Sequence, residues 1–195
     1  MNQLQHTLAT KIPLRFSDGG RFRILMVSDI HGGKGYDEKR TVAALDALIE
    51  THKPDLVLLA GDISGPGVIH IETADELRAM LDGLTRPMES RGIPWAHVYG
   101  NHDDNFGLSN AEQQPIYESY PHCVSKAGEK SLSGVGNYVL PIYDAAGNTV
   151  RFAVYGLDSH HSLEDNRATY GFPENTRFYS PYPNGGGEDG VHFDQ

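Results

Sequence analysis

The sequence has 195 residues, enough for one domain, and its apolar content approaches that of globular proteins once Gly is counted and Tyr is not. Acidic residues outnumber basic ones by 26 to 16, and the formal charge of −10 argues against binding a nucleic-acid backbone or an anionic membrane. The single cysteine, Cys123, excludes an internal disulfide. Because no stretch has the character of a signal peptide or a membrane span, we expect a cytoplasmic protein.

Strands and helices are predicted to alternate along the first hundred residues. In chain order we expect a short strand at Leu14 to Phe16, a strand from about Phe22 to Ser28, a helix from Thr41 to Glu50, a strand from Leu56 to Ala60, a helix from Glu72 to Ser90 and a strand from Trp95 to Tyr99. This order is typical of βαβ units, whose right-handed crossovers bring the ends of parallel strands to one edge.

Two details support these elements. The run from Leu56 to Ala60 is entirely apolar, as expected for a strand that is buried on both faces. Thr73 and Glu76 have the spacing of a capping box at the start of the second helix. His97 lies on the third strand of this unit, and we interpret it as a core or edge histidine rather than a ligand.

The second half of the chain is predicted to be less regular. We expect a short helix from Ala111 to Tyr120, and a hairpin of Tyr138 to Tyr143 and Val150 to Leu157 around a turn at 144–148. From residue 158 the sequence is rich in Gly, Pro, Asn and Tyr and shows no clear period.

Polar side chains follow each strand of the βαβ pattern. Asp29 and His31 end the first strand, Asp62 ends the second, and Asn101 and His102 end the third. Since side chains at i and i+2 of an extended backbone point the same way, we expect Asp29 and His31 to converge. Carboxylate, imidazole and amide donors at one sheet edge predict a site for ions such as Fe, Mn or Zn.

Three short blocks together carry a family resemblance. Asp29-Ile30-His31, Gly61-Asp62 and Gly100-Asn101-His102-Asp103 resemble the first three signature blocks of the calcineurin-like metallophosphoesterases. The resemblance implies an α/β sandwich of two mixed sheets flanked by helices, incomplete at its C-terminus. It covers about residues 22–160 of a single domain spanning 1–195, with 161–195 as an irregular tail, and implies the N-terminal portion of a catalytic domain.

The resemblance implies a centre of two divalent or trivalent ions. Asp29 and His31 would bind the first ion, Asp62 would bridge both, and Asn101 would bind the second. A metal-bridging hydroxide would attack the phosphorus atom of a small phosphate monoester or diester.

The resemblance also implies two catalytic residues. His102 would protonate the leaving group or stabilise its charge, and Asp103 would orient His102.

Two residue comparisons indicate a branch of the family. The purple acid phosphatases carry a tyrosine ligand three residues after the bridging Asp, where this chain has Gly65, and they lack the histidine found here at position 31. The chain therefore resembles the non-purple, Asp-x-His type of purple-acid-phosphatase-like protein.

The later blocks of the family have no counterpart here. Those blocks supply further histidines, including a Gly-His-x-His sequence, and the candidates in this chain are His160, His161 and His192. We interpret His160 and His161 mainly as loop residues, because adjacent residues would point in opposite directions on a strand, whereas His192 stands where a strand could start.

Metal-dependent phosphoester hydrolysis is therefore the leading interpretation. The alternative is a truncated, non-catalytic relative that acts as a metal-poor binding module. A different class of α/β hydrolase is disfavoured because the sequence lacks Gly-x-Ser-x-Gly. The sequence does not identify the substrate, the metal or the oligomeric state.

Overall fold

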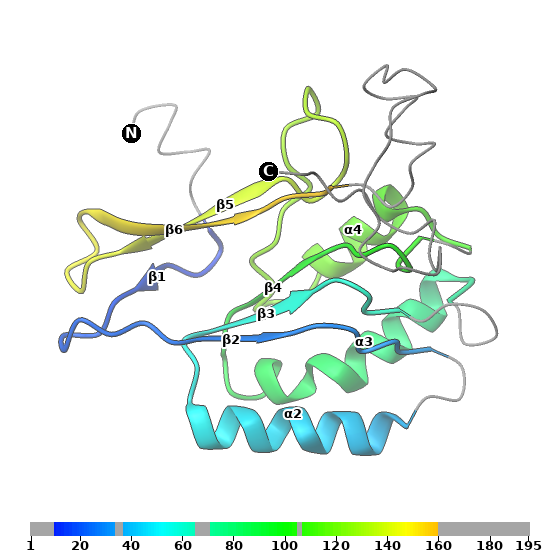
Figure 1. The fold of residues 1–195 in the computed structure, drawn as a ribbon, viewed down its shortest axis with the longest axis horizontal. Helices are drawn as coiled ribbons and strands as arrows, with labels where there is room; N and C mark the ends of the chain where they lie inside the picture. Colours follow the sequence, from blue (N-terminus) through cyan, green and yellow to red (C-terminus); the bar gives the residue numbers. More distant parts are fainter. Residues whose placement is uncertain (1–9, 34–36, 65–70, 105–106, 160–195) are drawn as a thin grey trace, which may run out of the picture.

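A computed structural model describes residues 10–33, 37–64, 71–104 and 107–159, which form two sheets and three helices (Figure 1). The elements are β1 (Leu14–Arg15), β2 (Ile24–Val27), α2 (Glu38–His52), β3 (Leu56–Ala60), α3 (Ala74–Glu89), β4 (Trp95–Val98), α4 (Asn110–Glu118), β5 (Tyr138–Tyr143) and β6 (Val150–Gly156). Each corresponds to a predicted element. The predicted tail at 161–195, with His161 and His192, and also His160, lies outside the described residues.

The first sheet carries the three strands of the βαβ pattern. Its order is β2-β3-β4 and all three strands are parallel, so their carboxyl ends lie at one edge as predicted. The second sheet has the order β1-β5-β6, in which β1 runs parallel to β5, and β5 and β6 form the predicted antiparallel hairpin.

The alternation of side chains on β3 and β4 creates two apolar layers. Val57, Leu59 and Trp95 belong to a core cluster with residues of α2, α3 and α4. Leu56 and Ala96 face the other way and pack with residues of the second sheet, including Leu140 and Ile142. The predicted α/β sandwich of two sheets flanked by helices is thus confirmed, with α2 and α3 on the side of the first sheet away from the second (Figure 1).

Local capping signals fix the helix starts. Thr73 and Glu76 form the predicted capping box of α3, in which each side chain accepts a hydrogen bond from the other residue's backbone N–H. Helix α2 begins at Glu38, three residues before the predicted start, because the Asp37 carboxylate caps it by accepting from the Arg40 N–H.

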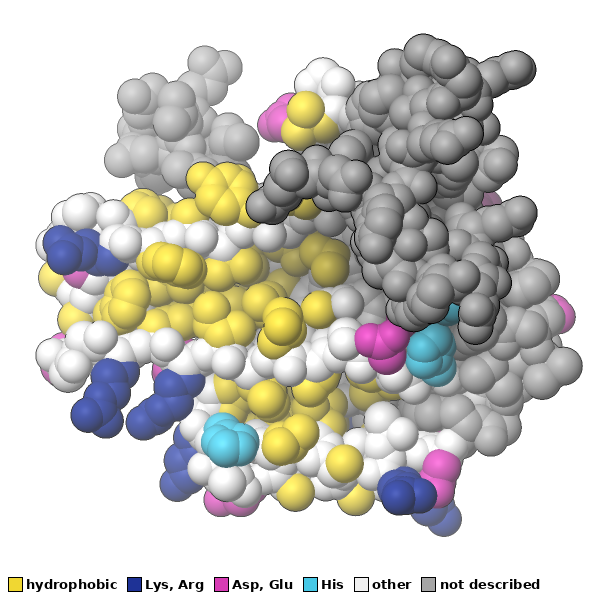
Figure 2. All heavy atoms as spheres, in the orientation of Figure 1, with side chains coloured by type: hydrophobic (Ala, Val, Ile, Leu, Met, Phe, Trp, Pro, Cys, Tyr) yellow, Lys and Arg dark blue, Asp and Glu magenta, His cyan; other side chains and the backbone are white. Residues whose placement is uncertain are grey.

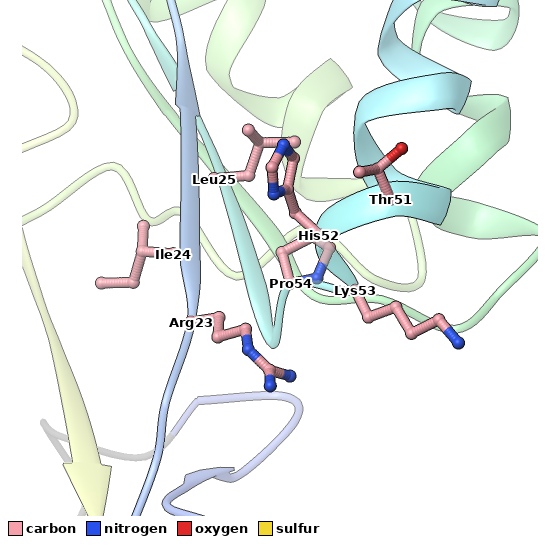
Figure 3. A pocket seen from close by; sticks show the side chains of 7 residues that line it. All are labelled: Arg23, Ile24, Leu25, Thr51, His52, Lys53 and Pro54. Carbon is pink, nitrogen blue, oxygen red and sulfur yellow. The ribbon is translucent and has the colours of Figure 1, made fainter.

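The surface of the described residues has an apolar side and, near the start of β2, a hollow. Hydrophobic side chains gather on the face where β2 and β6 are the outer strands (Figure 2). A hollow of about 640 Å³ lies between the start of β2 and the end of α2, at the opposite end of β2 from the polar strand ends (Figure 3). No helix among residues 10–33, 37–64, 71–104 and 107–159 has both the length and the apolar character needed to cross a bilayer.

His97 is a core residue, as predicted. Its side chain is buried, and its ring stacks on Tyr117 with a centroid separation of 3.7 Å and meets the edge of Tyr99 at 5.0 Å. Burial lowers the pKa of His97 from 6.5 to about 3, against a smaller opposing effect of the Gln114 side chain. The imidazole is therefore neutral in the folded protein at neutral pH.

We expect His97→Phe to flatten the acid dependence of stability while keeping an aromatic ring against Tyr117. Between the folded pKa of about 3 and the unfolded value of 6.5, the wild-type chain gains a proton on unfolding, so its stability falls as the pH falls through this window. The slope of unfolding free energy against pH should decrease by about 1 kcal/mol per pH unit in the variant. Urea unfolding across the window measures it, with His52→Gln at the exposed end of α2 as the control; equal slopes for wild type and His97→Phe would contradict the expectation.

Candidate metal centre at the ends of the parallel strands

The backbone after β2 and β3 turns into the left-handed region at the predicted ligands. The φ angles are 55° at Asp29, 49° at His31 and 50° at Asp62, and Lys53 is the one other non-glycine residue of the described chain with positive φ. The prediction of an extended backbone from 29 to 31 was therefore wrong, because β2 ends at Val27. Such conformations cost about 1 kcal/mol each, so the surrounding loops must hold them in place.

Backbone hydrogen bonds beyond the strand ends supply that support. The N–H of Asp29 donates to Gly61, that of His31 to Asp62 and that of Gly32 to Ile63, at 3.2, 2.9 and 2.7 Å. The two loops thus continue to run side by side after the regular strands have ended.

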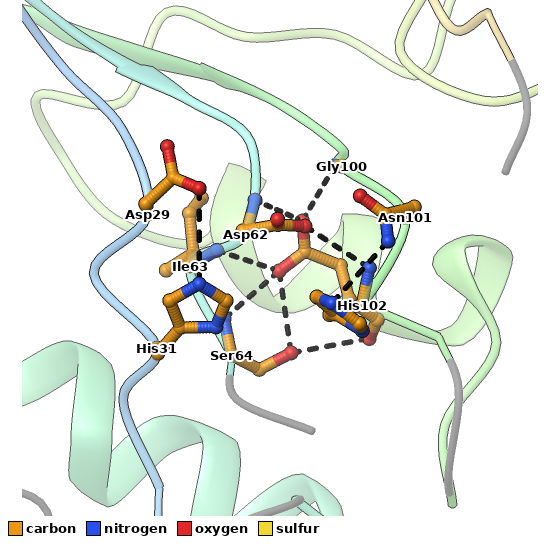
Figure 4. A network of polar contacts seen from close by, with 9 residues as sticks. Asp29, His31, Asp62, Ile63, Ser64, Gly100, Asn101 and His102 are labelled. Atoms are coloured by element: carbon orange, nitrogen blue, oxygen red, sulfur yellow. Dashed lines mark hydrogen bonds and ion pairs between the residues drawn. The ribbon is translucent and has the colours of Figure 1, made fainter. Parts of the chain in front are cut away.

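The predicted ligands Asp29, His31 and Asp62 come together in this arrangement. One ligand atom each of Asp29, His31 and Asp62 lies within 4.8 Å of the others, and Asp29 Oδ1 is 3.7 Å from His31 Nε2 (Figure 4). Ligand bonds of about 2.1 Å separate the donors of one ion by up to about 4 Å, so small side-chain rotations would suffice to hold one. The Nδ1 atom of His31, on the other side of the ring from Nε2, is buried and has no hydrogen-bond partner in the described chain.

The third strand brings Asn101 and His102 beside this cluster. The backbone N–H of His102 donates to Asp62 Oδ1 at 3.0 Å, and the His102 ring centroid is 5.6 Å from that of His31. Asn101 Nδ2 lies 3.3 Å from His102 Nε2. Asn101 thus lies in the same group of side chains, and its role as a ligand stays a prediction.

Gly100 permits the close approach of the third loop to Asp62. A Cβ atom at position 100 would lie 2.5 Å from the Asp62 nitrogen and closer still to Asp62 Oδ1. A side chain at this position would therefore displace the carboxylate from the cluster.

Asp103 lies beneath the ligands and joins two of the loops. Its buried carboxylate accepts hydrogen bonds from the backbone N–H groups of Asp62, Ile63, Ser64 and Gly100 at 2.7 to 3.0 Å. Burial raises the pKa of Asp103 to about 6, while the hydrogen bonds from Gly100 and Ser64 oppose that rise. These contacts make Asp103 a clamp on the loops, and its predicted role in orienting His102 stays a prediction.

Sequence reasoning did not identify two supporting residues, Ser64 and Gln113. The Ser64 hydroxyl lies 3.2 Å from an Asp103 carboxylate oxygen, and the buried Gln113 amide on α4 donates to the backbone carbonyls of Asp103 and Leu108. The sequence does not indicate that Gln113 and Gln114 are buried, because the apolar residues of α4 do not mark one clear buried face.

Comparison with known proteins identifies a family and several relatives that are similar to this chain. The family model of the calcineurin-like phosphoesterases matches residues 22–186. A protein of Arabidopsis thaliana named "Probable inactive purple acid phosphatase 28" is 28% identical over 88% of this chain and 50% of its own length. "Phosphatase DCR2" of Saccharomyces cerevisiae is 30% identical over 75% of this chain and 28% of its own length. The chain thus spans half or less of these relatives.

A solved structure, the Pseudomonas putida nuclease MPE, is also similar in part. It is 21% identical, covers 63% of this chain and 59% of its own length, and superposes with a TM-score of 0.36.

We expect Gly100→Ala to weaken Mn²⁺ binding by about tenfold or more, because the added methyl group would push the Asp62 carboxylate out of the cluster. Calorimetric titration with Mn²⁺ measures the effect. Gly19→Ala is the matched control, since its Cβ would have no neighbour closer than 3.9 Å. Unchanged affinity in Gly100→Ala would show that the close approach does not matter for metal binding.

We expect Asp103→Ala to lower the free energy of unfolding by about 3 kcal/mol, because it leaves four backbone N–H groups without their acceptor. Urea unfolding of the metal-free protein measures it, and the exposed Asp18→Ala serves as the control. A loss no larger than that of the control would refute the clamp.

Proposed function

Because the chain belongs to the calcineurin-like phosphoesterase family, we propose that it carries part of a metal-dependent enzyme that hydrolyses a small phosphate monoester or diester. The observation that carries the proposal is the cluster of Asp29, His31 and Asp62, whose ligand atoms lie within 4.8 Å of one another. Oxygen and nitrogen donors in this combination suit Fe, Mn or Zn.

The bound ions would supply positive charge that attracts the phosphate and lowers the pKa of the attacking water. Asp29 and His31 would hold the first ion, Asp62 would bridge to the second, and Asn101 would bind the second. Metal ions held in this way would let a chain with a formal charge of −10 bind an anionic substrate, since the positive charge would come from the ions and not from clustered Lys and Arg.

His102 is the proposed general acid. Its backbone is tied to Asp62 Oδ1, and its ring lies beside that of His31, so the imidazole borders the place where a metal-bound phosphate would sit. A proton delivered to the leaving-group oxygen would neutralise the charge that develops there. Asp103 would keep this geometry by holding the third loop against the second.

We assign the complete activity to a longer polypeptide. The chain spans 50% of one relative and 28% of another, and the described residues supply a single imidazole to the three-residue cluster. The further histidines that a two-metal centre needs would come from outside the described part of the chain.

A non-catalytic relative is the second candidate. It is favoured by the word "inactive" in the names of three Arabidopsis thaliana relatives, which are 26 to 30% identical to this chain. Such a protein would use the same fold as a binding module and would hold metal weakly or not at all.

We expect Asp62→Asn to reduce the bound metal more than Asn101→Ala does, because a bridging ligand serves both ions. Elemental mass spectrometry on manganese-loaded protein gives the metal content per chain, and the proposed bridge predicts a loss at both sites. Equal metal retention in the two variants would contradict the assignment of Asp62. A wild-type chain that retains no metal would favour the non-catalytic candidate.

We expect His102→Ala, in a full-length form that hydrolyses p-nitrophenyl phosphate or its bis ester, to lower kcat by about 100-fold or more. The metal content should stay that of the wild type, because His102 is proposed to act on the leaving group. Loss of metal together with activity would instead make His102 a ligand. Comparison of the two substrates separates monoesterase from diesterase activity.

A further inference from the structure

Asp103 is held at two separate points, and helix α4 provides one of them. Besides its carboxylate, which joins the loops after β3 and β4, its backbone carbonyl accepts hydrogen bonds from the Gln113 side-chain amide and from the Ser64 hydroxyl. The same Gln113 amide donates to the Leu108 carbonyl at 2.9 Å. Gln113 therefore ties the loop after β4 to the helix that follows it.

The burial of Gln113 is costly, which indicates a role other than packing. Only 3% of the residue is exposed, and its Oε1 atom is buried without a hydrogen-bond partner in the described chain. A buried acceptor that loses water without gaining a partner is destabilising. An apolar side chain of similar length at this place in α4 would avoid that penalty, so stability alone does not account for a glutamine.

Asn101 and His102 come immediately before Asp103 and lie beside Asp62 (Figure 4). The His102 N–H donates to Asp62 Oδ1 at 3.0 Å, and Asn101 Nδ2 lies 3.3 Å from His102 Nε2. A shift of the Asp103 carbonyl would change the backbone torsions of that residue and so move His102 relative to Asp62. Displacements of this kind reduce catalysis strongly, because reacting groups must keep a narrow range of geometry.

We propose that Gln113 is a positioning residue for the metal centre: by holding the Asp103 carbonyl, it sets the direction in which Asn101 and His102 project. This inference rests on the proposed function, in which Asn101 binds the second ion and His102 acts on the leaving group. Gln113 would touch neither the ions nor the substrate, because it is buried and its amide donates to backbone carbonyls.

The neighbouring Gln114 is buried to the same degree but has different partners. Its Oε1 atom accepts from the Tyr99 hydroxyl at 3.0 Å, and its Nε2 atom donates to Glu118 Oε1 at 2.9 Å. The Tyr99 hydroxyl also lies 3.1 Å from the Asn110 carbonyl, so it keeps a partner when Gln114 is changed. These hydrogen bonds join α4 to Tyr99 and to its own last turn, which makes Gln114 a matched control for Gln113.

Amide hydrogen exchange, followed residue by residue by NMR on the metal-free 195-residue chain, tests the positioning without an activity assay. Gln113→Met removes the amide and keeps a flexible, unbranched side chain, and Gln114→Met is the same change one residue on. We expect the amides of Gly100 and His102, which are hydrogen-bonded within the site, to exchange about tenfold faster in Gln113→Met than in Gln114→Met. The amides of Trp95–Val98 are the internal reference, because a global loss of stability would speed their exchange in the same proportion. Equal exchange of Gly100 and His102 in the two variants would overturn the proposal.

The leaving group of the substrate gives a second readout in an active, full-length form. We expect Gln113→Met to lower kcat for phenyl phosphate by at least about tenfold while KM changes by less than about twofold. The loss should be smaller for p-nitrophenyl phosphate, whose better leaving group depends less on a proton from His102. Gln114→Met should change both rates by the same factor. An equal loss for the two esters in Gln113→Met would make Gln113 a structural residue and overturn the positioning of His102.

The two proposals can fail separately. A wild-type full-length protein that hydrolyses neither ester would refute the proposed function. The amides of Gly100 and His102 would then still decide whether Gln113 holds the loop: unchanged exchange refutes it, and faster exchange confined to this loop supports it.

Discussion

The arrangement of the site depends on the carboxylate of Asp103. It accepts backbone hydrogen bonds from Asp62, Ile63 and Ser64 after β3 and from Gly100 after β4, so one buried group joins the two loops. Donors of this kind offset much of the cost of burying a carboxylate. The side chain with the most hydrogen bonds near the site therefore lies under it, while among the proposed ligands Asp62 accepts one backbone hydrogen bond from the third loop, that of His102.

Contacts between the loops also hold the left-handed backbone at Asp29, His31 and Asp62. A proposed ligand that turns toward the common point leaves the regular path of its strand. The backbone hydrogen bonds from Asp29 to Gly61 and from His31 to Asp62 stabilise the less favourable left-handed conformation there. Local strain and the convergence of donors are thus two results of one loop geometry.

The two sheets differ in how well they are covered. The helix side of β3 and β4 is packed by α2, α3 and α4 and contains the stacked pair of His97 and Tyr117. The outer strands β2 and β6 have buried partners on the inside, such as Leu56 and Ile142, but expose Met26 and Phe152. Exposed apolar side chains on the outer strands of both sheets are costly in water.

The sequence by itself determined the order and type of the elements, because apolar periodicity and capping boxes such as that of Thr73 and Glu76 are local properties. It also indicated the candidate ligands, since parallel strands end at one edge of a sheet. The turn of Asp29 and His31 out of the strand, the clamp by Asp103 and the support from Gln113 were decided by the tertiary structure. These features depend on contacts between residues far apart in the chain, for which a single sequence carries no periodic signal.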